Sequence, residues 1–215
     1  MKKIFICLFL ISCGPKPVFV TEQGLNVYCE EAVCFSKEHF DVSTEILISN
    51  LIQKDPKNYS YDKIHNMLES EDQWHDIYVK EKKIGSIGSC PSSTDPNRRC
   101  EGFECGKSSK SGWCFGLTKN KTVYDVKYYE IYFAKFYECF AVNAYLHEMI
   151  HFFQEKMTGF RDYDHATEPL WSSACTEEKY PDVGARTNCK KNSVENDTSW
   201  KVCELFCEDL CKYFR

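Results

Sequence analysis

The stretch His147-Glu148-Met149-Ile150-His151 is the most informative part of this sequence. Residues four positions apart share one face of an α-helix, so the two histidines can present imidazole nitrogens to one metal ion. Glu148 then lies beside that ion, where its carboxylate can accept a proton from water. A random order of this composition, which has six histidines, gives about 0.016 matches to the pattern. We therefore expect a metal site, and the competing interpretation is a core helix with two hydrogen-bonded histidines.

A helix is predicted from Glu138 to Met157, around this stretch. The segment contains no glycine or proline, and its apolar residues recur at helical spacing. These residues are Phe140, Ala144, Met149, Ile150, Phe153 and Met157. Gly159 follows as a natural end to the helix. The two histidines are thus expected on a buried helix.

Strands are predicted before this helix. Residues 113–117 and 121–126 are aromatic and β-branched, and Thr118-Lys119-Asn120 between them is typical of a hairpin turn. A further strand is expected at 128–133. Elsewhere the sequence predicts helices from Ser43 or Thr44 to Lys54, at 61–70 and at 200–212, a strand at 74–79, and a long cross-linked loop at 85–112. This order of elements predicts an α+β fold.

A third metal ligand must come from elsewhere in the chain. A catalytic zinc ion usually has three protein ligands and one open position. The segment after the helix can fold back beneath it, and His165 is the first choice because neutral imidazole is a common zinc ligand. Asp162, Asp164 and Glu168 are the alternatives, and His165 would then be an exposed loop histidine. Tyr163, in the same segment, is a candidate donor to an oxyanion.

The run from His147 to His151 resembles the active-site helix of the zincin metallopeptidases, and the resemblance covers mainly residues 113–171. It implies an α+β fold in which a small twisted sheet lies above the active-site helix and substrate binds along the edge strand. It also implies a zinc ion on His147 and His151, Glu148 as general base, and a peptide or protein substrate. The residues after His151 do not follow the metzincin, thermolysin-like or aspzincin patterns, so no subfamily is assigned.

The N-terminus has the features of a targeting segment. Two lysines precede the apolar stretch Ile4–Ile11, which is too short to span a bilayer. Leu10-Ile11-Ser12-Cys13 resembles the lipobox of bacterial lipoproteins, which implies removal of residues 1–12, lipid on Cys13 and anchoring in the cell envelope. An ordinary secretory signal is the alternative. We expect a tether at 13–26 and one domain at 27–215.

The cysteine content agrees with an extracytoplasmic protein. Of the fourteen cysteines, twelve remain after Cys7 and Cys13 are set aside, which predicts up to six disulfides with undetermined pairing. A zinc-thiolate site at Cys203, Cys207 and Cys211 is the alternative. The formal net charge is −5 and no basic run occurs, which argues against nucleic-acid binding.

Three functions are compatible with these features. The first is a zinc metallopeptidase. The second is a lipid-anchored surface binding protein with an inactive zincin-like fold, and the third is an amidase that acts on cell-wall peptides by the same chemistry. The second function would be favoured if the protein bound no zinc, or if replacement of Glu148 had no effect on its function.

Overall fold

The computed structural model describes residues 16–30, 34, 36–70, 76–81, 103–104, 113–114, 116–123, 126–133 and 138–206. The predicted signal segment 1–12 and Cys13 lie outside these residues, as does most of the predicted loop at 85–112. None of the described helices is long and apolar enough to cross a bilayer. The described elements form the mixed α+β architecture that the sequence predicts.

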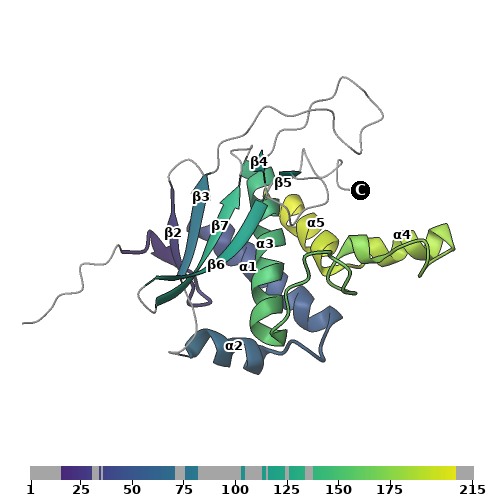
Figure 1. Ribbon diagram of the computed structural model, residues 1–215, viewed down its shortest axis with the longest axis horizontal. Coiled ribbons are helices and arrows are strands. Elements are labelled where there is room, and N and C mark those ends of the chain that lie inside the picture. Colours follow the sequence, from purple (N-terminus) through teal and green to yellow (C-terminus); the bar gives the residue numbers. More distant parts are fainter. Residues whose placement is uncertain are drawn as a thin grey trace, which may run out of the picture.

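A five-stranded mixed sheet forms one layer of the molecule, with the strand order β1-β2-β3-β7-β6 (Figure 1). Its strands are β1 (Phe19–Val20), β2 (Asn26–Cys29), β3 (Asp76–Glu81), β6 (Gly116–Val123) and β7 (Val126–Phe133). The central strands β2, β3 and β7 run parallel, whereas β1 and β6 are antiparallel strands at the two edges. A separate ribbon pairs β4 (Phe103–Glu104) with β5 (Trp113–Cys114).

Helices form the second layer. They are α1 (Lys37–Lys54), α2 (Tyr61–Glu69), α3 (Glu138–Thr158), the short 3-10 helix η2 (Ser172–Ala174), α4 (Val183–Lys191) and α5 (Val194–Phe206). The long helix α3 contacts β6 and β7 on one side and α1, α2 and α5 on the others. Figure 1 shows α4 extending away from the rest of the fold. Helix α3, which carries the two histidines of the metal-binding pattern, therefore lies between the sheet and the other helices that it contacts.

The core lies between the sheet and the helices. Val27, Ile77 and Val79 are fully buried on one face of the sheet, whereas the stacked rings of Tyr28 and Tyr78 lie on the other face with centroids 4.4 Å apart. The helices and the residue before η2 add large side chains to the same cluster: Phe40, Leu47, Leu51, Tyr145, Met149, Phe152, Phe153, Trp171 and Val202. This alternation along β2 and β3 explains why the helical layer packs on one face.

Helix α1 begins earlier than the sequence predicts. The predicted start at Ser43 or Thr44 is wrong, because Ser36 caps the helix and its hydroxyl accepts a hydrogen bond from the backbone of His39 at 3.2 Å. Ser43 and Thr44 are instead buried in the middle of the helix, and the Thr44 hydroxyl lies 2.9 Å from that of Tyr145. For Thr44, tertiary hydrogen bonding therefore replaced the capping role that its residue type favours.

Two further predictions on secondary structure need correction. Thr118-Lys119-Asn120 is not a turn, because these residues lie inside β6 and pair with residues 129–131 of β7. Pairing with a long neighbouring strand outweighs the turn preference of the three residues. The helix predicted at 200–212 begins at Val194, and α4 was not predicted at all. The predicted strand at 128–133 and the helix from Glu138 are confirmed.

The folded part also begins earlier than residue 27. Strand β1 lies within the predicted tether at 13–26, and its residues Phe19 and Val20 pair with β2. Leu25, in the same segment, is fully buried in the core. The segment from β1 onward therefore belongs to the sheet and is not a free tether.

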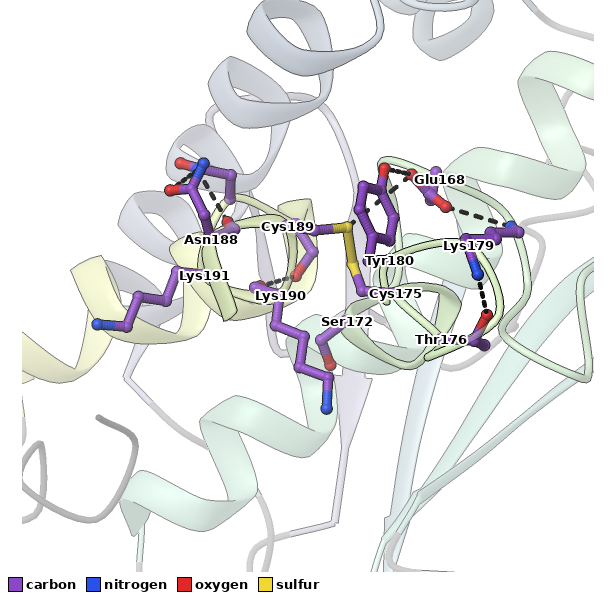
Figure 2. The surroundings of a disulfide bond; sticks show 12 residues. Glu168, Ser172, Cys175, Thr176, Lys179, Tyr180, Asn188, Cys189, Lys190 and Lys191 are labelled. Carbon is purple, nitrogen blue, oxygen red and sulfur yellow. Dashed lines mark hydrogen bonds and ion pairs between the residues drawn. A yellow bond between two sulfur atoms is a disulfide. The ribbon is translucent and has the colours of Figure 1, made fainter. Parts of the chain in front are cut away.

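The prediction of disulfides is confirmed for five cysteines whose side chains the structure describes. Cys29 is bonded to Cys34, and Cys175 is bonded to Cys189. Cys203 is also disulfide-bonded, so it does not form the thiolate zinc site considered as an alternative. The bond between Cys175 and Cys189 ties α4 to the end of η2 (Figure 2).

Candidate metal centre

Helix α3 brings two of the predicted metal ligands together. His147 and His151 are one helical turn apart, and their ring centroids are separated by 5.2 Å. His165 approaches from the following loop, and its Nε2 lies 3.0 Å from the Nε2 of His151. One nitrogen from each of the three imidazoles lies within 4.8 Å of the others, an arrangement that could hold a metal ion.

The backbone of the loop turns sharply to place His165. Gly159 ends α3 with a φ of 70°, a conformation that glycine adopts without strain. His165 itself has a φ of 52°, which is uncommon for a residue with a side chain and costs on the order of 1 kcal/mol. The Ser173 hydroxyl donates to the His165 carbonyl at 2.9 Å. Strain of this kind is retained where the surroundings hold it, often at functional sites.

Asp162, one of the alternative ligands, holds the loop in place. Its backbone N–H donates to the Gln154 side-chain carbonyl at 3.1 Å, and its carboxylate accepts from the backbone of Thr167 at 2.6 Å. Both Asp162 and Gln154 are buried. The ion pair between Arg161 and Glu155, at 3.1 Å, adds a second link between the loop and α3. The loop that carries His165 is thus fixed to the helix that carries His151.

The other candidates do not belong to the group of side chains that could hold a metal ion. The carboxylate of Glu168 accepts from the Tyr180 hydroxyl at 2.6 Å and from the Lys179 ammonium at 3.2 Å (Figure 2). Asp164 is exposed. Tyr163 is also exposed, and the guanidinium of Arg161 lies 5.7 Å from its ring centroid. In the described part of the chain, the group of side chains able to hold a metal comprises only the three histidines.

The indole of Trp171 forms one wall of this centre. Its ring centroid lies 4.9 Å from that of His147, 4.5 Å from that of His151 and 4.4 Å from that of His165. Trp171 is fully buried, so it keeps water from that side of the imidazoles. An apolar wall of this kind lowers the local dielectric around a metal site.

Glu195, at the start of α5, contacts the centre through His147. Its Oε1 lies 2.9 Å from the Nδ1 of His147, and its Oε2 accepts from the backbone and the hydroxyl of Ser172 at 3.2 and 2.8 Å. Sequence analysis did not identify this residue. Ser193, whose hydroxyl accepts from the backbone of Asn196 at 3.2 Å, marks the helix start that would have drawn attention to Glu195.

The pKa shifts of two of the three histidines favour the neutral form that binds a metal. Burial, followed by the charges of His147 and His165, lowers the pKa of His151 to about 2. Burial also lowers the pKa of His165. Burial lowers the pKa of His147 too, but the hydrogen bond to Glu195 and the charges of Glu148 and Glu195 outweigh it, so the pKa is raised. His151 and His165 are therefore uncharged at neutral pH, with lone pairs available to a metal ion.

Glu148 is buried on the same helix, between the two histidines in sequence. The Nδ1 of His151 and the Nε1 of Trp171 are buried and have no hydrogen-bond partner among the described residues. The assembled group therefore comprises three imidazoles, one buried carboxylate on α3 and a second carboxylate that contacts His147.

No protein-family model, curated protein or solved structure matches this chain.

Proposed function

We propose that this protein is an extracytoplasmic zinc metallopeptidase with a zincin-like active-site helix. The observation that supports the proposal most directly is the convergence of His147, His151 and His165 within 4.8 Å, on and beneath a helix that also carries Glu148. Two of these histidines and the glutamate form the HExxH pattern, which resembles that of the zincin metallopeptidases.

Zinc is the metal that fits the donor set best. Three neutral imidazoles are typical ligands of catalytic zinc, whereas magnesium and calcium prefer oxygen ligands. Two nitrogens bound to one tetrahedral zinc, each at about 2.1 Å, lie about 3.4 Å apart. The separation of 3.0 Å between the Nε2 atoms of His151 and His165 is close to this value. When bound, zinc supplies a Lewis acid that acidifies water and polarises a carbonyl group.

Glu148 is proposed as the general base. Its carboxylate accepts a proton from the water that attacks the scissile carbonyl and later returns that proton to the leaving amine. The residue is 3% exposed, so its carboxylate acts in a poorly solvated environment in which charge interactions are strong. His147, His151 and His165 hold the metal in this scheme.

The edge strand β6 is proposed as the place where substrate binds. Among the described strands it pairs with β7 alone, and it contacts α3. An extended peptide can add to such an edge through backbone hydrogen bonds. This arrangement agrees with what the zincin resemblance implies for a peptide or protein substrate.

An extracytoplasmic location is part of the proposal. The two disulfides with both partners described, Cys29–Cys34 and Cys175–Cys189, are typical of oxidising compartments. Lipid on Cys13 would anchor the chain in a bacterial cell envelope. Replacement of Cys13 by Ala should abolish incorporation of labelled fatty acid and release the protein from membranes, whereas unchanged membrane association would contradict the anchor.

The decisive experiment combines zinc stoichiometry with peptide hydrolysis. The oxidised protein should contain about one zinc per chain, and His165→Ala should contain much less. Glu148→Gln should keep zinc but lose hydrolysis of a peptide library by several orders of magnitude, because the base is gone. Glu204→Gln, on the exposed side of α5, is the matched control and should behave like the parent.

Two outcomes would overturn the proposal. A folded parent without zinc would make the inactive binding protein the better explanation. Full activity in Glu148→Gln would contradict the proposed base. Hydrolysis restricted to cell-wall peptides, with zinc present, would retain the chemistry and identify an amidase.

A further inference from the structure

We infer that Glu195 is a positioning residue that fixes His147 as an Nε2 ligand of the metal, with Ser172 holding the Glu195 carboxylate in place. The inference rests on the proposed metal centre and adds a role that the zincin resemblance does not supply. Its basis is a relay of hydrogen bonds that runs from η2 through α5 to α3.

The direction of each hydrogen bond follows from the groups involved. An ionised carboxylate only accepts, so the Nδ1 of His147 must carry the proton that it shares with Glu195 over 2.9 Å. The Glu195 carboxylate accepts three hydrogen bonds, one from His147 and two from Ser172, and such a set of donors favours its ionised form. With Nδ1 protonated, the lone pair of His147 is on Nε2.

The second carboxylate oxygen is held independently of the histidine. The backbone N–H and the hydroxyl of Ser172 both donate to Oε2 of Glu195, at 3.2 and 2.8 Å. Ser172 directly follows Trp171, whose indole packs on the three imidazoles. The residues that hold the carboxylate and the wall of the metal centre therefore belong to one short segment.

The backbone around Glu195 is also fixed. The N–H groups of Val194 and Glu195, at the start of α5, donate to the carbonyls of Pro169 and Leu170 at 2.9 and 3.0 Å. These N–H groups lack partners within the helix, so the bonds both satisfy them and join α5 to the segment before Trp171. Glu195 can therefore keep its carboxylate in one position as the metal binds or leaves.

Outer hydrogen bonds of this kind orient ligands and raise their basicity, and their loss typically weakens metal binding by 10- to 100-fold. His151 gives an internal contrast, because its Nδ1 has no partner among the described residues. Among the described residues, the hydrogen bonds of this relay reach His147 and not His151.

The test is the affinity for zinc alone, measured by competition with a chromophoric chelator in the full oxidised protein. Glu195→Gln keeps the size of the side chain, but its amide has one acceptor oxygen and cannot accept hydrogen bonds from both His147 and Ser172. The Kd for zinc should therefore rise about 10- to 100-fold. Ser172→Ala should raise the Kd less, because the backbone donor remains. Glu204→Gln is the control and should match the parent.

Nitrogen NMR of the metal-free protein gives a readout that a purely structural role would not change. At alkaline pH the His147 ring should be the Nδ1–H tautomer in the parent and should shift toward Nε2–H in Glu195→Gln. If folded Glu195→Gln binds zinc as tightly as the parent and its His147 tautomer is unchanged, the inference is wrong. The proposed metal centre would be unaffected by that result. A folded parent that binds no zinc would instead overturn the proposed function.

Discussion

The Nε2 atoms of His151 and His165 lie 3.0 Å apart although the residues are fourteen positions apart in the chain. Burial keeps both rings uncharged, since it lowers both pKa values. Two neutral imidazoles at this distance can share either one proton or one metal ion between them. The two possibilities differ in their response to added metal, because only the second makes stability depend on zinc.

Zinc should therefore stabilise the protein. At a free zinc concentration one thousand times the Kd, the free energy of unfolding should increase by about 4 kcal/mol. Thermal denaturation with zinc and with excess chelator measures the difference. Magnesium at the same concentration is the control and should have little effect, because it prefers oxygen ligands. Identical melting temperatures in zinc and chelator would contradict the metal centre.

Replacing His165 should separate metal binding from backbone strain. His165→Ala and His165→Gly both remove the imidazole, and both should lose zinc. Only glycine adopts the left-handed conformation at this position without a penalty, so metal-free His165→Gly should be about 1 kcal/mol more stable than His165→Ala. Urea denaturation in chelator provides the comparison. Equal stabilities would indicate that the loop relaxes around alanine.

Asp162 should act through the loop and not as a ligand. Asp162→Ala removes a charged acceptor from the backbone of Thr167, which should cost about 1.5–3 kcal/mol of stability. Asp162→Asn keeps an oxygen acceptor and should cost less. Both variants should still bind one zinc per chain, with weakened affinity. Complete loss of zinc in folded Asp162→Asn, measured by metal analysis, would identify Asp162 as the third ligand.

The disulfide between Cys175 and Cys189 should contribute stability but not metal ligands. It closes a loop with a sequence separation of 14, for which chain entropy predicts a contribution of about 3 kcal/mol. The double serine variant should unfold at lower denaturant and retain one zinc, because the imidazoles are held by α3 and by Asp162. A folded double variant without zinc would show that α4 supports the centre directly.

Acid should weaken the contact between Glu168 and Tyr180. The hydrogen bond from Tyr180 lowers the pKa of Glu168 below its ordinary value of 4.5, with a further contribution from Lys179. The stabilisation is thus complete above pH 4.5 and is lost as the pH falls through the lowered pKa. The melting temperatures of Glu168→Gln and the parent should therefore converge as the pH falls through the lowered pKa of Glu168. The melting temperature of the control Glu178→Gln, at an exposed position, should equal that of the parent at every pH.

The sequence predicted best what local spacing controls. The helix that carries His147 and His151 follows from periodicity and from Gly159, and the choice of His165 followed from its chemistry and its place after the turn. The loop geometry was not predictable in the same way, because it depends on a positive φ at His165 and on the buried carboxylate of Asp162. Residue type alone could not show that Asp162 holds the loop whereas the His165 imidazole joins the group that could hold a metal.

Contacts over long sequence separations were beyond sequence reasoning. Glu195 is 48 positions from His147, and no pattern joins them. Thr44 has the residue type of a helix cap but is bonded to Tyr145, 101 positions away. In both cases the role of the residue is determined by which helices pack together, and that packing depends on the whole core.

The docking of α5 on α1 has a consequence for the kinetics of folding. Asn50 donates to Thr198 at 2.9 Å across 148 positions, and Lys54 pairs with Asp197 at 3.0 Å. Contacts of such high contact order form late, because a long loop must close first. Glu195 reaches His147 only after this closure, so the support that α5 gives to the metal centre forms late, although the three imidazoles are close together in sequence. Zinc should consequently slow unfolding and leave the folding rate nearly unchanged, which would make the metal a source of kinetic stability.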